Sequence, residues 1–167
     1  MDRHKSLLII SRRLLIFAAI SLLATAILFA ATFFFGKRFL ISWFCFECGI
    51  IGGFVSIQQR LWKIEDEELA LLSESWATIM VIPIYGGIFA LVLYMLFLSG
   101  LLEGNLFPDF GIPEFNNPPT TENLRDLFTK AYPKTASDFA KFAVWSFVAG
   151  FSERFVPQII GKMTSKQ

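Results

Sequence analysis

We predict an all-α, polytopic membrane protein with four transmembrane helices, and three features of the 167-residue sequence lead to this prediction. Hydrophobic residues make up 54% of the chain and include 20 phenylalanines, which is more apolar surface than a water-soluble domain of this length buries. The apolar residues gather in four segments, each close to the roughly 20 residues needed to cross a bilayer. The remaining polar segments are suited to connecting these helices.

The four apolar segments differ in how closely they match an ordinary transmembrane helix. The first and third carry no charge, the second carries Glu47, and the fourth contains Lys141 and a Ser-Glu-Arg triplet. We predict spans at 14–35, 39–57, 76–98 and 139–160, which together form a single membrane domain of residues 14–160.

The distribution of lysine and arginine predicts which side of the membrane each connection occupies. With four spans, nine of these residues fall on the side of the two termini and six fall on the other side. Positive residues favour the cytoplasmic side, so we expect the basic tail 1–13 and the tail 161–167 in the cytoplasm. The protein would then be a multi-pass protein of the bacterial inner membrane.

The two longer connections are each expected to contain a short helix. The cytoplasmic connection, 58–75, has leucines at helical spacing, which predicts a short amphipathic helix. It carries an acidic run that we interpret as a docking surface for a cytoplasmic partner: Glu65, Asp66, Glu67 and Glu68. The external loop, 101–137, is predicted to hold a helix that Thr121 caps and Pro133 ends, with its apolar face on the membrane surface or on the bundle.

Most catalytic and metal sites need residues that this sequence does not supply. The single histidine, His4, lies in the N-terminal tail, and no nucleophile or phosphate-binding motif occurs. Cys45 and Cys48 form a C-x-x-C pair, but they lie near mid-span, so we interpret them as packing residues and not as reactive thiols. We therefore expect no enzyme activity, no cofactor and no metal. The net charge of +1 argues against direct nucleic-acid binding.

One face of the second span consists of small residues at helical spacing: Cys45, Gly49, Gly52, Gly53 and Ser56. Small side chains let two helices approach closely, as in Gly-x-x-x-Gly pairs. We interpret this face as the contact through which copies of the chain form a homo-oligomer. The number of subunits stays open, and a tetramer is one candidate.

Glu47 lies roughly opposite this small face, since two residues turn an α-helix by about 200°. A carboxylate inside the membrane costs on the order of a few kcal/mol unless it is paired, protonated or hydrated. Two interpretations remain. Glu47 either lines an ion or proton pathway, or it is a structural carboxylate that is hydrogen-bonded between helices.

The Ser-Glu-Arg triplet places two charges near the cytoplasmic end of the fourth span. We expect Arg154 to reach the interface while its aliphatic stem stays in hydrocarbon. Glu153 is expected to pair with Arg60 at the end of the second span, which would form a clasp between the two helix ends. The alternative is that these residues form a gate or a docking surface for a cytoplasmic partner.

The second to fourth spans resemble a pattern found in small bacterial four-helix membrane proteins. The matching stretches are GIIGGFVSIQQRL, IPIYGGIFALVLYMLFLSGLL and AGFSERFVPQII. The chain is similar in these stretches to the KwaA family, the membrane subunits of the Kiwa anti-phage systems. This resemblance implies a role in phage defence beside a cytoplasmic DNA-binding partner, and it supplies no catalytic residues.

Together these features predict a non-enzymatic inner-membrane subunit. It would be surrounded by membrane lipids, would associate with itself, and would anchor or signal to a cytoplasmic protein partner. The alternative is a pore-forming or ion-channel defence effector in which Glu47 faces the conduction path.

Overall fold

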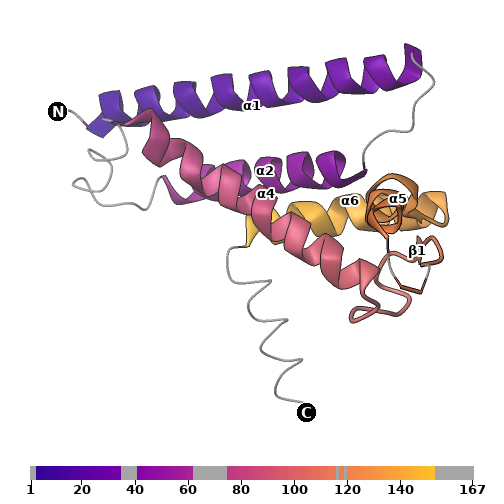
Figure 1. Ribbon diagram of the computed structural model, residues 1–167. Helices are drawn as coiled ribbons and strands as arrows, with labels where there is room; N and C mark the ends of the chain where they lie inside the picture. Colours follow the sequence, from indigo (N-terminus) through magenta and orange to yellow (C-terminus); the bar gives the residue numbers. More distant parts are fainter. Residues whose placement is uncertain (1–2, 35–40, 62–74, 116, 119, 153–167) are drawn as a thin grey trace.

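The structure is a computed structural model that describes residues 3–34, 41–61, 75–115, 117–118 and 120–152 (Figure 1). Within these ranges the chain is 78% helical, in keeping with the predicted all-α class. Three helices are long and apolar enough to cross a membrane, over Lys5–Ala31, Ile41–Arg60 and Ile79–Leu98. The fold is therefore compatible with a membrane protein in which these three helices cross the bilayer.

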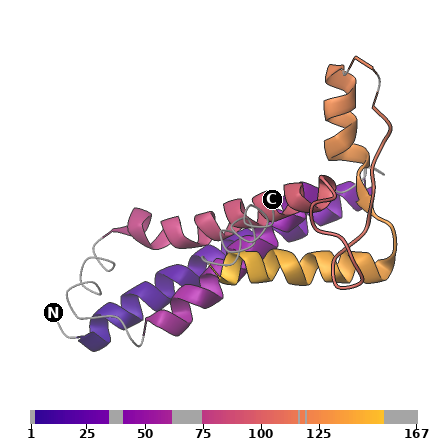
Figure 2. The same ribbon diagram turned by 90° about the horizontal axis from the view of Figure 1, so that it is seen from below.

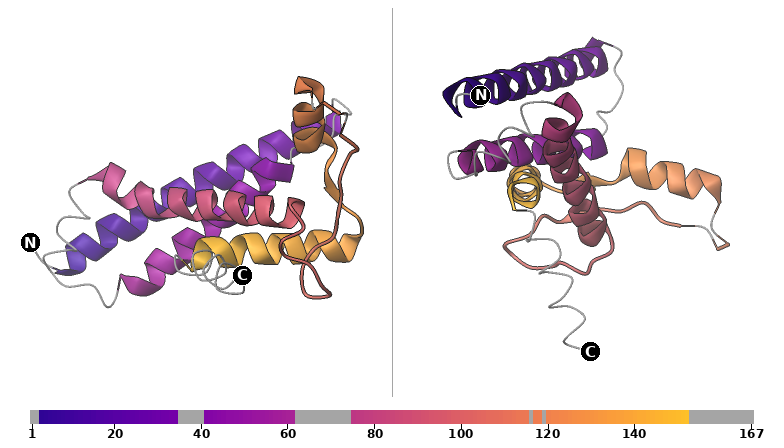
Figure 3. Two further views of the ribbon diagram at one scale, coloured as in Figure 1. Left: turned by 60° about the horizontal axis from the view of Figure 1, so that its bottom comes forward. Right: turned by 90° about the vertical axis from the view of Figure 1, so that its left-hand side faces the viewer.

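Three helices pack together as the core of the bundle: α2 (Ile41–Arg60), α4 (Trp76–Leu98) and α6 (Ala136–Phe151). The right-hand view of Figure 3 shows them grouped, while α1 (Arg3–Phe34) lies to one side. Tyr94 and Phe142 are fully buried in this core, with their ring centroids 5.4 Å apart. The centre of the bundle is therefore aromatic, as the phenylalanine content of the sequence suggests.

The first helix is attached to the bundle mainly at its N-terminal end. Ile10 and Leu14 are buried there in an apolar cluster that α2, the turn after it and α4 complete with Ile57, Leu61 and Ile79. At the other end, Phe33 and Phe34 are 81% and 82% exposed. Because α1 begins at Arg3, most of the expected basic tail 1–13 is helical, in a segment without glycine or proline. Its place in the cytoplasm stays a prediction.

The second and third predicted spans correspond closely to helices of the structure. α4 has the predicted bounds, 76–98, and α2 begins and ends slightly later than the predicted 39–57. Pro83 lies inside α4, where it lacks the N–H that would complete a helical hydrogen bond. A Cβ built on Gly53 of α2 would lie 3.0 Å from Pro83 Cα, so the proline packs against the small-residue face of α2.

Within the described residues, the fourth predicted span, 139–160, corresponds to α6, which is shorter than a membrane-spanning helix. α6 begins earlier, at Ala136, because Thr135 caps it by accepting a hydrogen bond from the backbone N–H of Asp138 at 3.1 Å. The helix ends at Phe151. Its 16 residues rise about 24 Å, which is less than the ~30 Å thickness of a hydrocarbon core.

The end of α6 has a local physical reason. Gly150 and Ser152 both have low helix propensity, and the backbone of Ser152 is extended, with φ −114° and ψ 98°. Residues 153–167 lie outside the described part of the chain, so a fourth crossing stays a prediction.

The connection between α4 and α6 has more structure than one helix in a loop. It contains α5 (Thr121–Lys130) and a short antiparallel pair, β1 (Phe110–Gly111) and β2 (Tyr132–Pro133). The pair was not predicted, because two-residue strands are too short to show an alternation of polar and apolar residues. The cap of α5 is Thr120, one residue before the expected Thr121, and the helix ends at Lys130, so that Pro133 belongs to β2. Figure 2 shows α5 running crosswise to the bundle.

The predicted cytoplasmic helix in 58–75 lies mostly outside the described residues. α2 continues through the first part of this connection to Arg60, and the description resumes at Ser75, directly before α4. The acidic run 65–68 falls between these points, so its proposed docking role stays a prediction.

Candidate functional site

The small-residue face of α2 is buried against α4 and α6 of the same chain. A Cβ on Gly49 would lie 2.5 Å from the carbonyl oxygen of Gly86 and 2.9 Å from the Cα of Gly87, both in α4. Gly150 of α6 meets the backbone of Gly49 as well. Backbones this close leave no room for a side chain, which explains why glycine stands at each of these crossing positions.

This packing corrects the prediction that the small-residue face of α2 is the contact between copies of the chain. Gly52 faces the backbone of Phe147 in α6, Gly53 faces Pro83 in α4, and Ser56 is partly buried. A face that is filled by helices of its own chain is not available to a second copy. The small-residue period shows that α2 packs closely against something, but it does not say whether the neighbour belongs to the same subunit. A homo-oligomer would need another surface.

Cys45 is part of the same close-packed interface. Its Sγ lies 3.2 Å from the carbonyl oxygen of Ala90 and 3.2 Å from Ser146 Oγ, and that hydroxyl in turn donates to the carbonyl of Phe142 at 2.7 Å. These bonds join α2, α4 and α6 in a fully buried position. Cys45 and Cys48 are both free thiols, and Cys48 is partly buried. The arrangement supports packing as the role of this pair.

Glu47 is buried on the side of α2 that faces α1. Only 5% of the residue is exposed, and Ser21 of α1, itself 8% exposed, donates a hydrogen bond from its Oγ to Oε2 of Glu47. The carboxylate thus links α1 to the three-helix core. A hydrogen bond between two helices is what the interpretation of Glu47 as a structural carboxylate requires.

Sequence reasoning missed Ser21, although a signal was present. Ser21 and Thr25 stand one helical turn apart, on one face of an otherwise apolar span. The hydroxyl oxygen of Thr25 is buried and has no hydrogen-bond partner among the described residues. Serine and threonine side chains on a transmembrane helix can hydrogen-bond across to a neighbouring helix, and Glu47 accepts such a bond from Ser21.

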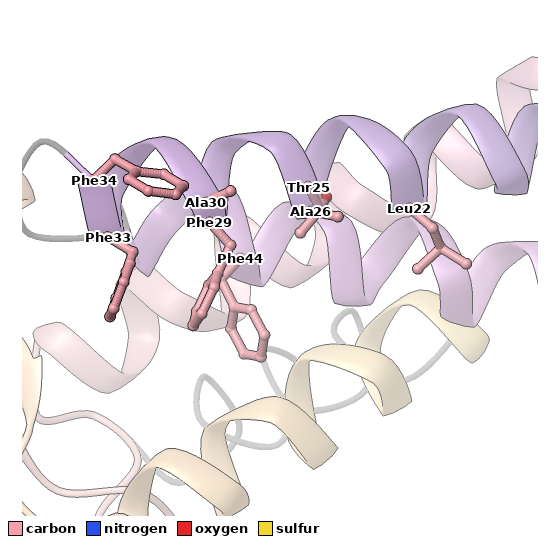
Figure 4. Close-up of a pocket in the computed structure, with 8 residues that line it drawn as sticks. All are labelled: Leu22, Thr25, Ala26, Phe29, Ala30, Phe33, Phe34 and Phe44. Atoms are coloured by element: carbon pink, nitrogen blue, oxygen red, sulfur yellow. The ribbon is translucent and has the colours of Figure 1, made fainter.

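The C-terminal half of α1 and the start of α2 enclose an apolar groove of about 480 Å³ (Figure 4). One lining residue, Phe44, belongs to α2, and α1 supplies the others: Leu22, Thr25, Ala26, Phe29, Ala30, Phe33 and Phe34. Apart from the hydroxyl of Thr25, the lining is hydrocarbon. A groove of this kind can accept apolar chains, but it offers no charged or strongly polar groups to conduct an ion.

The expected clasp at the inner end is only partly within the described residues. Arg60 is exposed in the last turn of α2, whereas Glu153 and Arg154 lie outside the described part of the chain, so their pairing stays a prediction. A different contact is present near this end. The guanidinium of Arg13 lies 5.6 Å from the ring centroid of Trp76, which brings α1 and the start of α4 together through a cation–π contact.

The α4–α6 connection is fastened to α6 by polar groups that the sequence analysis did not single out. Trp145 donates from Nε1 to the carbonyl of Leu106 at 2.9 Å, and the Lys141 Nζ lies 3.4 Å from the carbonyl oxygen of Phe107. The rings of Phe107 and Trp145 also pack together in a tilted arrangement, with their centroids 5.3 Å apart. These contacts join residues far apart in the sequence, and no local motif marks them.

Asp138 is held in the first turn of α6 by two neighbours. The Thr135 hydroxyl donates to Oδ2 at 2.6 Å, and Lys141 Nζ lies 3.4 Å from Oδ1. The hydrogen bond from Thr135, with smaller contributions from the backbone of Asp109 and from Lys141, lowers the pKa of Asp138 below its ordinary value of 3.8. The carboxylate therefore stays charged at neutral pH and stabilises the N-terminus of the helix.

The described residues contain no group of three or more His, Cys, Asp or Glu side chains that could hold a metal ion. No protein-family model, curated protein or solved structure matches the chain.

Proposed function

We propose that the chain is a non-enzymatic subunit of the bacterial inner membrane that anchors or signals to a cytoplasmic partner in phage defence. The observation that carries this proposal is the hydrogen bond from Ser21 to Glu47, which makes the intramembrane carboxylate a link between α1 and the core. A carboxylate used in this way supports a scaffold more than a catalyst or a conduction site. The defence role is taken from the resemblance to the KwaA family.

The inner end of the bundle is where such a subunit would meet its partner. The apolar cluster around Ile10 and Leu14 and the contact between Arg13 and Trp76 both bring α1 to the ends of α2 and α4. The acidic run 65–68 joins these same helix ends in the sequence. A partner bound there would therefore contact three helices at once, and a displacement of α1 would reach its binding surface.

Self-association is part of the same proposal, through a surface other than the glycine face. Native mass spectrometry of the protein in nanodiscs would give the number of subunits directly. A single mass corresponding to one copy would remove this part of the proposal and leave the anchoring role untouched.

The alternative function, a pore or channel, requires Glu47 to face water on a conducting path. The apolar groove beside the Ser21–Glu47 contact favours the scaffold, because hydrocarbon walls do not replace the hydration shell of an ion. The purified wild type in planar bilayers should therefore give no reproducible currents. Single-channel currents that Glu47→Gln alters, and that a matched change at the exposed Glu103 does not, would reverse the preference.

The partner can be sought by crosslinking in living cells. A photoreactive benzoylphenylalanine at Asp66 should capture a cytoplasmic protein, whereas the same residue at Asn117 in the opposite connection should not. Equal capture from both positions would contradict the assignment of the acidic run to a docking surface. Capture only from position 117 would also reverse the proposed orientation.

A further inference from the structure

The direction of α5 relates it to the membrane. Figures 2 and 3 show α5 projecting sideways, across the direction of α2, α4 and α6, at the end of the bundle where α2 and α6 begin. It contacts α2 there. If the long helices cross the bilayer, a helix laid across them at one end lies parallel to the membrane plane. Its projecting part extends beyond the other described helices, over the place where lipid would surround the bundle.

The apolar stripe of α5 is used only in part by the bundle. Ala131, directly after the helix, is fully buried, and Leu127 packs against the aromatic core. Leu124 and Phe128 occupy the other edge of the same stripe, since successive residues turn by about 100°. They are 56% and 37% exposed. The helix therefore has two apolar edges, one of which the described chain leaves uncovered.

The polar residues of α5 are arranged as in a helix that lies in a membrane interface. Glu122, Asp126 and Thr129 lie opposite the apolar stripe, and Arg125 and Lys130 flank it on its two sides. Lys130 pairs with Asp126 at 2.6 Å, while Arg125 is exposed next to the uncovered edge. A basic side chain in this position can reach lipid phosphates while the apolar edge enters the acyl boundary.

The uncovered edge of α5 is accompanied by other exposed apolar residues at the same end of the molecule. They include Leu106, Ile112 and Phe115 in the connection and Phe139 at the start of α6. The outward sides of α4 and α6 carry further exposed apolar residues, such as Met95 and Val144. The connection thus exposes apolar side chains at one end of the bundle, and the outward sides of α4 and α6, which lipid would contact, are apolar as well.

We propose that α5 is an interfacial helix that docks on the bilayer leaflet at the end of the bundle where α2 and α6 begin, with Leu124 and Phe128 in the acyl boundary and Arg125 at the lipid phosphates. The partner is the phospholipid surface around the protein's own bundle. Docking would hold the whole α4–α6 connection flat on the membrane, because β1 and β2 and the Trp145–Leu106 bond tie it to α6. The inference depends on the bundle crossing the membrane, and it does not depend on a defence role or a cytoplasmic partner.

Spin labels of known position test this docking in nanodiscs of phosphatidylethanolamine and phosphatidylglycerol. The label is attached to p-acetylphenylalanine, which leaves Cys45 and Cys48 intact, and it is placed at Phe128 or, as the matched control on the polar face, at Glu122. Power saturation then measures collisions with oxygen, which concentrates in lipid, and with a water-soluble nickel chelate. The ratio of oxygen to nickel accessibility should be several-fold higher at Phe128 than at Glu122.

Three outcomes would overturn the proposal. Equal, water-like ratios at both positions would mean that α5 stands free in solvent. A label at Phe128 that neither oxygen nor nickel reaches would mean that a protein surface, such as a second copy, covers this edge. A lipid-like label at Glu122 with a water-like label at Phe128 would mean that the helix is turned over. A label at Leu124 repeats the measurement if the Phe128 variant does not fold.

Discussion

Ser21 on α1 donates a hydrogen bond to the buried carboxylate of Glu47 on α2, so the first helix is joined to the core by a polar contact in an apolar setting. The other described contacts of α1 with the core include the apolar cluster around Ile10 and Leu14. Among the described residues, Ser21 is the donor that satisfies this carboxylate. Removing that donor and removing the acceptor should have different consequences.

Ser21→Ala should destabilise the protein by ~1–3 kcal/mol, because it leaves a buried carboxylate without its donor. Equilibrium unfolding with sodium dodecyl sulfate in mixed micelles measures this loss. Ser11→Ala, a partly buried serine on the same helix, is the matched control and should change stability by less than ~0.5 kcal/mol. In the Ser21→Ala background, Glu47→Leu should recover stability, since it removes the unsatisfied group. Equal effects of the two serine changes would contradict the structural role of the bond.

Gly49→Ala should destabilise the bundle by ~1–3 kcal/mol, because overpacking forces backbones apart. The new Cβ would lie 2.5 Å from the carbonyl oxygen of Gly86 and 2.6 Å from the Cβ of Ala90. Gly111→Ala is the control, since its Cβ would meet its nearest neighbour, the carbonyl oxygen of Tyr132, at an ordinary 3.8 Å. Thermal unfolding in detergent compares the two variants. A Gly49→Ala protein as stable as Gly111→Ala would show that α2 and α4 do not approach this closely.

Trp145→Phe should loosen the start of the α4–α6 connection. The change removes the indole N–H that donates to the carbonyl of Leu106 at 2.9 Å but keeps an aromatic ring against Phe107. A net loss of ~1 kcal/mol is expected for this hydrogen bond. Limited proteolysis near Leu106 should therefore become faster than in the wild type. Trp43→Phe on α2 should leave that rate unchanged, and faster cleavage in both variants would point to general destabilisation.

Asp138 should make stability depend on pH in the acid range. The folded-state pKa of Asp138 is lowered, chiefly by the hydrogen bond from Thr135. The stabilisation that Asp138 contributes is therefore present above the ordinary pKa of 3.8, and it is lost as the pH falls through the folded-state pKa. The difference in stability between wild type and Asp138→Asn should therefore shrink as the pH is reduced from neutral toward 3. Unfolding curves across this range measure it. A constant difference, or one that grows on acidification, would contradict the assignment.

Local features of the sequence determined much of the helical content. The bounds of α4 follow from an uninterrupted apolar run, and the cap of α5, Thr120, lies one residue before the predicted Thr121, after a Pro- and Asn-rich stretch. The small-residue period of α2 identified a close-packed face, since that period depends only on helix geometry. The end of α6 at Phe151 was missed, because the apolar composition beyond it suggested a longer helix.

The tertiary structure alone decided which surfaces meet. A helical period identifies a face but does not name its partner, so Gly49 packs against Gly86 of its own chain where the sequence suggested a second copy. In the same way, the sequence indicated a buried acceptor at Glu47 without identifying its donor. The packing of α1 against α2 makes Ser21 that donor. The crosswise course of α5 likewise depends on how the chain folds back between α4 and α6. Contacts of this kind join residues far apart in the chain, and they exist only once the backbone brings them together, whereas helix propensity and apolar period are carried by neighbouring residues.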